Sequence, residues 1–150
     1  MLESNLDIDY FVWFDHDIII KNFDIKLHDL INQYSFDNPN HLFMMSKDPC
    51  SKMDFNSGVC IFKNNIQTLD VFKKMLDIRN NPYKYPILEQ FYGFDFHKKN
   101  SLQYTRTFLV HFNENPEHLL SIPYRVLQSF HPAKNQYKLG DFCAHIAGPP

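Results

Sequence analysis

Runs of apolar residues, separated by polar clusters, divide this chain into short strands and helices. The run from Tyr10 to Phe14 is aromatic and β-branched, which is typical of a strand buried on both faces in a mixed or parallel sheet. Three polar residues follow it, and a second apolar run occupies positions 18–20. The chain therefore begins with a predicted strand, a short polar turn and a second apolar run.

A helical repeat follows these two apolar runs. Its apolar residues recur at i, i+3, i+4 and i+7, and Asp24 could cap the helix at its amino end. The repeat consists of Leu27, Leu30, Ile31 and Tyr34. The Asn-Pro-Asn segment at 38–40 ends the helix, and His41 to Ser46 is expected to form a short strand before a polar loop.

The middle of the chain repeats this alternation. Ser57 to Phe62 is an apolar strand, and Asn64 or Asn65 can cap the helix that follows. The Asn-Asn-Pro segment at 80–82 is expected to end that helix. Its predicted apolar face comprises Ile66, Leu69, Phe72 and Leu76.

The last third of the chain is less regular. Pro86 is a suitable first residue for a short helix that runs through Glu89 and Gln90. Positions 101–115 show an ambiguous pattern, 118–130 contain a strand, and 140–148 contain a short strand and a loop. Strands and helices alternate without a repeat or a linker, so a single α/β domain over residues 1–150 is predicted.

Composition narrows the functional classes. The chain has 150 residues, 44% of them hydrophobic, which can supply a substantial core, and its charge of −2 gives no electrostatic reason to expect nucleic acid binding. No apolar run approaches the roughly 18–20 residues that span a bilayer, and the first residues lack the regions of a signal peptide. A soluble chain without a membrane segment is therefore expected. The widely spaced Cys50, Cys60 and Cys143 are interpreted as buried free thiols.

The most informative polar cluster is Asp15-His16-Asp17, directly after the first strand. Two carboxylates this close repel each other unless a cation lies between them, and hard ions such as Mn²⁺ or Mg²⁺ accept carboxylate oxygens. Loops at the carboxyl ends of strands are also where open α/β sheets bind ligands. The alternative is a solvated turn, because Asp-x-Asp is a short pattern. Aspartyl-phosphate phosphatases share the spacing but have Gly or Thr next, where this chain has Ile18, so that activity is disfavoured.

Five short segments carry motifs in a fixed order. They are YFVWFDHDIII, MSKDPCSKMDFNSGVCIFKNN, ILEQFYG, IPYRVLQSF and GDFCAHIAG. Together they resemble the retaining glycosyltransferases of the fungal galactosyl- and mannosyltransferase type, which are related to plant xyloglucan xylosyltransferases. The similarity covers the aromatic strand with its Asp-x-Asp, an Asn-x-Gly before an apolar strand, an acidic-Gln helix start, and the closing Gly-Asp-Phe with His-x-x-Gly.

The resemblance implies a GT-A-like fold with a mixed, mostly parallel sheet flanked by helices. It implies that Asp15, Asp17 and His145 bind Mn²⁺ or Mg²⁺ together with the donor's diphosphate. Glu89 and Gln90 would be catalytic residues near the anomeric carbon, where the Gln amide can stabilise developing positive charge. The residues expected to bind the donor are Asp48, Asn56, Gly58 and Gly148.

The activity implied is transfer of a hexose or pentose, with retention, from a UDP- or GDP-linked sugar to a glycan or other hydroxyl acceptor. Family relatives sit in the Golgi behind a membrane anchor; no anchor is found here, so no compartment is assigned.

The chain also departs from the family. Only nine residues precede Tyr10, fewer than the roughly 30 of a βαβ unit, so it is expected to be the C-terminal metal- and sugar-binding portion of an N-terminally truncated enzyme. It could be a fragment, could pair with a second polypeptide that supplies the nucleotide-binding half, or could be a remnant. A non-catalytic binding or assembly subunit is the alternative function. Gln128 stands where the family has Asn, which puts a role for that turn in doubt.

Overall fold

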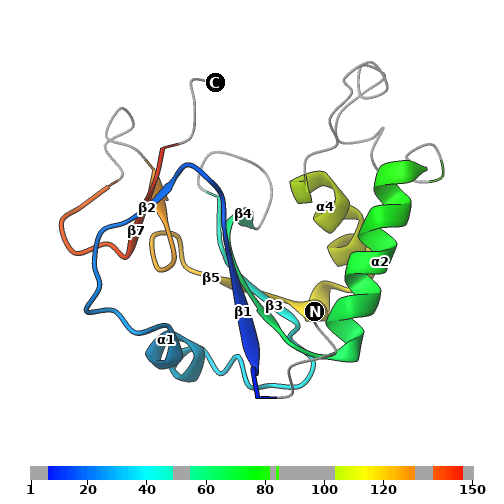
Figure 1. Ribbon diagram of the computed structural model, residues 1–150, viewed down its shortest axis with the longest axis horizontal. Coiled ribbons are helices and arrows are strands. Elements are labelled where there is room, and N and C mark those ends of the chain that lie inside the picture. Colours follow the sequence, from blue (N-terminus) through cyan, green and yellow to red (C-terminus); the bar gives the residue numbers. More distant parts are fainter. Residues whose placement is uncertain (1–6, 49–54, 82–83, 85–103, 131–136, 147–150) are drawn as a thin grey trace.

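The computed structural model describes residues 7–48, 55–81, 84, 104–130 and 137–146. Within them the chain forms two β-sheets with three α-helices beside them (Figure 1). In chain order the elements are β1 (Tyr10–Phe14), β2 (Ile18–Ile20), α1 (Leu27–Gln33), β3 (Phe43–Ser46), β4 (Asn56–Lys63), α2 (Ile66–Asn80), α4 (Tyr104–Glu114), η3 (Pro116–His118), β5 (Leu119–Ile122), β6 (Ser129–Phe130) and β7 (Cys143–His145). The predicted α/β class, with a mixed sheet flanked by helices, is confirmed.

The larger sheet has the strand order β1-β4-β3-β5. β4 pairs antiparallel with both β1 and β3, and β3 pairs in parallel with β5. Successive side chains of a strand point to opposite faces. Phe43 and Met45 accordingly pack in the core with α2 and α4, whereas Met44 and Val59 pack in the core with α1. Each face of this sheet therefore builds its own core.

The expectation of a mostly parallel sheet is wrong. Among the described residues, three of the five strand pairings are antiparallel. The prediction treated the apolar run at 10–14 as a strand buried on both faces. Instead β1 pairs only with β4 among the described strands, and its Trp13 is 50% exposed, because this run lies at the edge of the described sheet.

The smaller sheet has the order β2-β7-β6 and joins distant parts of the chain. β7 pairs antiparallel with β2 and in parallel with β6. The turn at 15–17 carries the chain from β1 in the larger sheet to β2 in the smaller one. The predicted Asp-x-Asp motif therefore lies where the two sheets meet.

The two predicted helix caps have different outcomes. Asn65 caps α2, because its side-chain oxygen accepts a hydrogen bond from the Thr68 N–H at 2.8 Å. The predicted cap at Asp24 is wrong, since α1 begins after Lys26, which makes no side-chain capping bond. The backbone N–H of Asp24 is instead bound by the side chain of Asn22 at 3.0 Å, in a local turn before the helix.

The predicted apolar face of α2 is wrong in part. Ile66 and Leu76 are 57% and 53% exposed, whereas Val71, Met75 and Ile78 are buried. The helix carries apolar residues on two adjacent faces, so its own periodicity does not distinguish them. Packing against α4 and the larger sheet selects the buried face.

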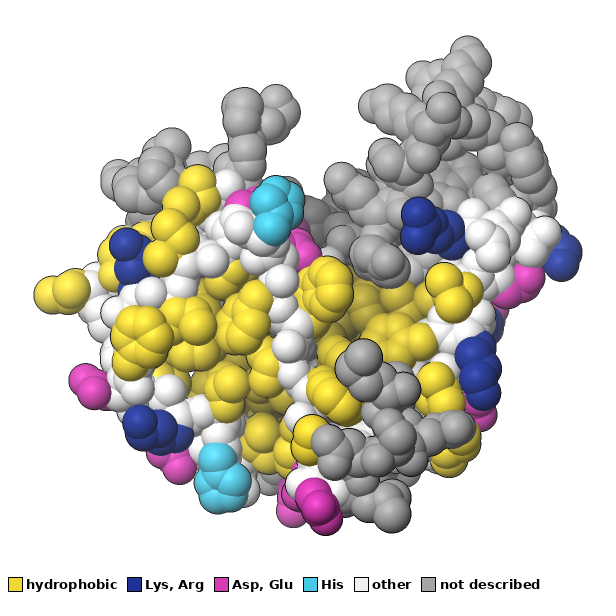
Figure 2. All heavy atoms as spheres, viewed as in Figure 1, with side chains coloured by type: hydrophobic (Ala, Val, Ile, Leu, Met, Phe, Trp, Pro, Cys, Tyr) yellow, Lys and Arg dark blue, Asp and Glu magenta, His cyan; other side chains and the backbone are white. Residues whose placement is uncertain are grey.

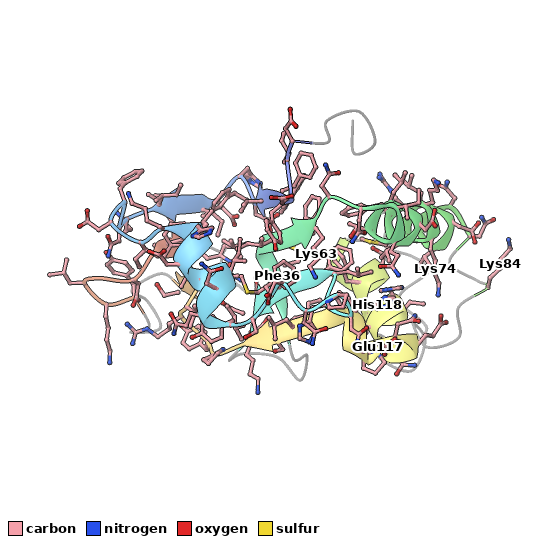
Figure 3. All side chains as sticks on the ribbon, turned by 90° about the horizontal axis from the view of Figure 1, so that it is seen from below. Phe36, Lys63, Lys74, Lys84, Glu117 and His118 are labelled. Carbon is pink, nitrogen blue, oxygen red and sulfur yellow. The ribbon has the colours of Figure 1, made fainter. Side chains whose placement is uncertain are left out.

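Polar contacts join elements that are far apart in the sequence. Lys63, at the end of β4, donates to the carbonyl of Asp37 at 3.3 Å and lies 5.3 Å from the centre of the Phe36 ring (Figure 3). Lys74 on α2 forms an ion pair with Glu114 on α4, the helix over the stretch whose pattern was ambiguous. These contacts connect β4 to the segment after α1, and α2 to α4.

Cys60 and Cys143 are buried free thiols, as predicted, and Cys50 lies outside the described residues. Burial raises the pKa of the Cys143 thiol to about 12, so this group stays protonated at neutral pH. Among the described residues, the helices are too short or too polar to cross a membrane. The short helix predicted from Pro86 also lies outside the described residues.

Candidate metal centre

The turn at 15–17 is fixed by backbone hydrogen bonds to both sheets. The N–H of Asp15 donates to the carbonyl of Gly58 at 2.8 Å, and the N–H of Ile18 donates to the carbonyl of Asp15 at 3.1 Å. At the other end, the N–H of Ile146 donates to the carbonyl of Asp17 at 2.9 Å. Both aspartates are therefore anchored through the main chain, so the position of the turn does not depend on their carboxylates.

His145 reaches this turn from β7. It lies opposite Ile18 in the pairing of β2 with β7, and its imidazole Nε2 is 3.3 Å from Oδ1 of Asp17. One ligand atom each from Asp15, Asp17 and His145 lies within 4.8 Å of the others. His145 is buried and both aspartates are partly buried. The structure thus brings together the three side chains that the sequence proposes as metal ligands.

These three side chains suit a divalent cation. Atoms that bind one Mn²⁺ or Mg²⁺ at roughly 2.0–2.2 Å lie up to about 4.4 Å apart, and the three ligand atoms lie within 4.8 Å of one another, which is close to that range. Two carboxylates supply hard oxygen ligands and negative charge. An imidazole nitrogen as the third ligand favours Mn²⁺, because Mg²⁺ takes oxygen ligands almost entirely.

A tryptophan orients the first carboxylate. The indole Nε1 of Trp13 donates to Oδ1 of Asp15 at 2.8 Å. Residues two apart in extended chain share a face, so Trp13, next to last on β1, is placed to bond Asp15 directly after the strand. The bond limits rotation of the Asp15 carboxylate and leaves its second oxygen free of that contact. Sequence reasoning did not assign Trp13 a role, although its i, i+2 spacing from Asp15 was a usable signal.

Gly58 makes room for the imidazole of His145. A Cβ atom at position 58 would lie 2.5 Å from Oε1 of Gln128, 2.7 Å from Cε1 of His145 and 2.8 Å from its Nδ1. Real Cβ atoms essentially never approach other heavy atoms this closely, so any larger residue would displace one of these side chains. The position requires glycine because of this packing, and the role of Gly58 in donor binding stays a prediction.

A hydrogen-bonded group lies beside the metal centre. The amide of Asn56 donates to Oδ2 of Asp48 at 3.3 Å, and its own oxygen accepts from the N–H of Gly58 at 2.9 Å. The same oxygen accepts from Nε2 of Gln128 at 2.7 Å. Three of the predicted donor-binding residues are therefore adjacent in space, and two of them, Asn56 and Gly58, have Gln128 as a neighbour.

Gln128 is a residue whose position sequence reasoning did not anticipate. It is fully buried, and its Oε1 accepts no hydrogen bond from the described residues. Burying a polar oxygen without a donor costs roughly 1–3 kcal/mol, so such a group usually serves a purpose. In the sequence, Gln128 was marked only as a polar residue after the apolar pair at 126–127. Its place beside the site became clear only from the pairing of β6, which follows it, with β7.

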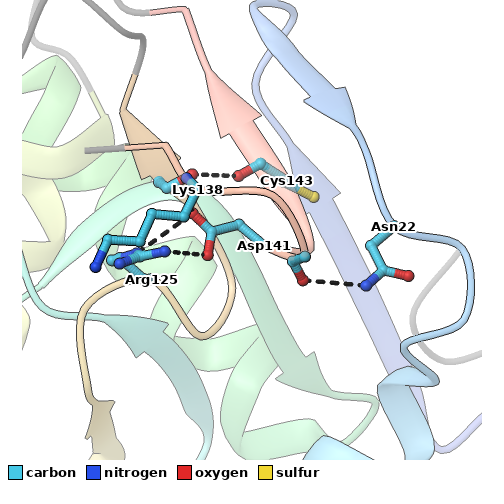
Figure 4. Close-up of polar contacts among 7 residues, drawn as sticks. Asn22, Arg125, Lys138, Asp141 and Cys143 are labelled. Atoms are coloured by element: carbon cyan, nitrogen blue, oxygen red, sulfur yellow. Dashed lines mark hydrogen bonds and ion pairs between the residues drawn. The ribbon is translucent and has the colours of Figure 1, made fainter. Parts of the chain in front are cut away.

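The loops that carry β7 are held by an ion pair (Figure 4). The guanidinium of Arg125 donates to both carboxylate oxygens of Asp141, at 2.5 and 3.3 Å. Burial alone would raise the pKa of Asp141, but the bonds from Arg125 and from the backbone N–H of Lys138 outweigh it and lower that pKa. Arg125 adopts φ 77°, a left-handed conformation that costs energy in a non-glycine residue, and the ion pair holds it there.

Two further bonds connect this region to its neighbours. The Ser129 hydroxyl donates to the carbonyl of Cys143 at 3.0 Å, and the side chain of Asn22 donates to the carbonyl of Gly140 at 3.0 Å (Figure 4). These bonds hold the start of β7, the strand of His145, and the loop before it. The predicted Glu89, Gln90 and Gly148 lie outside the described residues, so their roles stay predictions.

Comparison with known proteins identifies the fold. No protein-family model and no curated protein matches the chain. The crystal structure of a glycosyltransferase involved in the glycosylation of the major capsid of PBCV-1 is similar over 95% of this chain, with a TM-score of 0.64 and 17% sequence identity. This chain covers 62% of the length of that structure. The protein therefore has a glycosyltransferase-like fold.

Proposed function

We propose that this chain takes part in metal-dependent glycosyl transfer from a nucleotide sugar. The observation that carries the proposal is the meeting of Asp15, Asp17 and His145, from opposite ends of the described chain, on a fold similar to that of a glycosyltransferase. The ordered motifs of the galactosyl- and mannosyltransferase type support the same activity. The proposed donor is a UDP- or GDP-linked hexose or pentose, and the acceptor is a glycan or another hydroxyl compound.

The three ligands would hold Mn²⁺, or Mg²⁺ in its place. When bound, such an ion acts as a Lewis acid and neutralises the charge that develops on the leaving diphosphate. Trp13 orients the Asp15 carboxylate, and Gly58 leaves space for His145 beside it. In this proposal the protein keeps the ligand atoms of Asp15, Asp17 and His145 close together before the donor binds.

In the proposed reaction, the bond between the sugar's anomeric carbon and the β-phosphate oxygen breaks. The electron pair leaves with the nucleoside diphosphate. The acceptor's hydroxyl oxygen forms a new bond to the same carbon, and its proton passes to the departing phosphate. Attack on the face from which the phosphate leaves would retain the anomeric configuration, as the family resemblance implies.

The neighbouring polar group is the proposed site for the donor sugar. Asp48 and Asn56 offer a carboxylate and an amide, which suit the hydroxyl groups of a hexose or pentose. Gln128 holds Asn56 in place through its amide. We retain Gly148 as a donor-binding residue and Glu89 and Gln90 as catalytic residues in this proposal.

The test is metal and donor binding followed by transfer. We expect the wild-type chain to bind Mn²⁺ in calorimetry, and to bind UDP- or GDP-sugar only when Mn²⁺ is present. Asp17→Ala should weaken Mn²⁺ binding beyond the roughly 10–100-fold that follows loss of an outer-shell partner. Asp24→Ala is the matched control, because Asp24 is exposed and lies before α1, away from the ligands. Equal Mn²⁺ affinity in all three proteins would contradict the proposal.

A second candidate is a non-catalytic subunit that assembles with another polypeptide. It is favoured by β1, which pairs on one side only among the described strands and exposes half of Trp13. Strands with an unpaired edge readily accept another strand. Light scattering would distinguish the two candidates, since a monomer that binds nucleotide sugar and transfers the sugar by itself contradicts the second.

A further inference from the structure

A pocket lies beside the metal centre, between the larger sheet and the two long helices. It has a volume of about 360 Å³ and is lined from β1, β4, α2 and α4. Figure 2 shows hydrophobic side chains around the hollow between the strands and α2. Asp15, one of the three proposed metal ligands, forms part of its wall. The pocket is therefore continuous with the site described above.

The wall of this pocket is mainly aromatic and aliphatic. Aromatic rings come from Trp13, Phe62, Phe72 and Phe108, and Leu76 adds an exposed aliphatic side chain. Rings of this kind favour a flat apolar group, which they can contact by stacked or edge-on packing. Among the described residues, eleven line the pocket and four of these are polar, one of them Asp15. A largely apolar aromatic group needs few polar partners, which suits this wall better than a nucleobase with several polar edge atoms.

Trp13 connects the pocket to the metal centre. Its ring lines the pocket, while its Nε1 donates to the Asp15 carboxylate at 2.8 Å. A flat group that contacts this ring therefore lies directly beside one of the proposed metal ligands. A sugar attached to such a group would be held next to the donor's diphosphate, which is where an acceptor hydroxyl must be.

We propose that this pocket binds an aromatic group of the glycosyl acceptor, so that the acceptor is an aryl-bearing hydroxyl compound such as an aryl glycoside. The inference rests on the proposed function, because it assigns the acceptor of that reaction. It adds a binding site and a chemical class of substrate that neither the motifs nor the fold assigns.

The chain offers a built-in probe for this pocket. Trp13 is its single tryptophan, so intrinsic indole fluorescence reports on the pocket alone. We expect 4-nitrophenyl β-glucoside to quench this fluorescence saturably, with a dissociation constant at least about tenfold lower than that of methyl β-glucoside. Free N-acetyltryptophanamide, titrated in the same way, corrects for absorption and collisional quenching. Quenching that does not saturate beyond this correction overturns the inference.

Two variants on one helix test the location. Leu76 and Ile66 are similarly exposed on α2, but only Leu76 lines the pocket. We expect Leu76→Asp to weaken binding of 4-nitrophenyl β-glucoside about tenfold, because it places a charge against the bound ring, and Ile66→Asp to leave it unchanged. Circular dichroism confirms that both variants fold. Equal weakening by the two variants, or by neither, overturns the inference.

Two more titrations separate this inference from the proposed function. Mn²⁺ affinity is measured independently, and we expect Leu76→Asp to leave it unchanged, since Leu76 is not a ligand. Absence of saturable aryl glucoside binding in the wild type, with its Mn²⁺ binding intact, overturns the acceptor pocket alone. Absence of Mn²⁺ binding in the wild type instead overturns the proposed function and with it the acceptor assignment. Uridine is titrated as the competing occupant, and saturable uridine binding that Leu76→Asp weakens assigns the pocket to the donor and overturns the inference.

Discussion

The two sheets of this protein are stabilised in different ways. In the larger sheet, Phe43 lies at the centre of an aromatic cluster, with the rings of Phe62, Phe72, Phe108 and Phe112 at 5.2–6.2 Å from its own. The smaller sheet has strands of two or three residues and is tied together by polar contacts such as the pair Arg125–Asp141. Hydrophobic burial thus supplies most of the stability in one region, and directional polar contacts supply the site geometry in the other.

This difference predicts that substitutions in the two sheets alter different measured properties. A cavity in the larger sheet should lower the free energy of unfolding while the folded molecules keep their metal affinity. A displaced side chain in the smaller sheet should lower metal affinity with less effect on unfolding.

The largest effect is expected for Phe43→Ala. Phe43 is fully buried, and removing its ring leaves a cavity among four other rings, so the free energy of unfolding should fall by about 3–5 kcal/mol. Phe23→Ala is the control, because Phe23 is 75% exposed and its loss should change stability by less than about 0.5 kcal/mol. Urea denaturation measures both. Similar values for the two variants would contradict the assignment of the main core.

The next effect concerns the pH dependence of stability. His111 on α4 is buried, and its Nε2 lies 3.0 Å from Nδ1 of His118. Burial, and then the charges of His118 and Lys74, lower the pKa of His111 to about 4, against smaller opposing effects of Glu114 and Glu117. Because the unfolded imidazole binds its proton near pH 6.5, the free energy of unfolding should fall as the pH drops from about 6.5 to about 4, by up to about 3 kcal/mol.

Urea denaturation at pH 7, 5.5 and 4 measures this dependence. His111→Gln should reduce it, because the residue that must stay neutral in the folded state is gone. His28→Gln should preserve it, since His28 is exposed on α1. An unchanged pH dependence in His111→Gln would show that another group is responsible.

The smallest of the three effects is a loss of metal affinity, expected for Gly58→Ala. The added methyl group would lie 2.7 Å from Cε1 of His145, so the imidazole must move and Mn²⁺ affinity should fall by about 10–100-fold. Gly140→Ala is the matched control: nothing lies within 4 Å of its Cβ position, but φ is 100°. That variant should lose roughly 1 kcal/mol of stability through backbone strain and keep its metal affinity. The opposite pattern would contradict the role given to Gly58.

Local patterns predicted much of the secondary structure. The strand at 10–14 and the Asn65 cap agree with the structure, because each depends on neighbouring residues only. The buried face of α2 did not follow from its pattern, since α4 and the sheet determine which of two apolar faces is covered. Strand direction also escaped prediction, because an apolar run at a sheet edge resembles one at the centre.

The sequence by itself determined the α/β class and identified Asp15 and Asp17 as a pair of carboxylates that calls for a cation. Residue order and spacing contain that information. Only the tertiary structure placed His145 against Asp17, and Gln128 beside Asn56. The physical reason is that both contacts depend on the smaller sheet, where β7 pairs with β2 across most of the chain. Such pairing is set by the packing of the whole domain rather than by any local pattern.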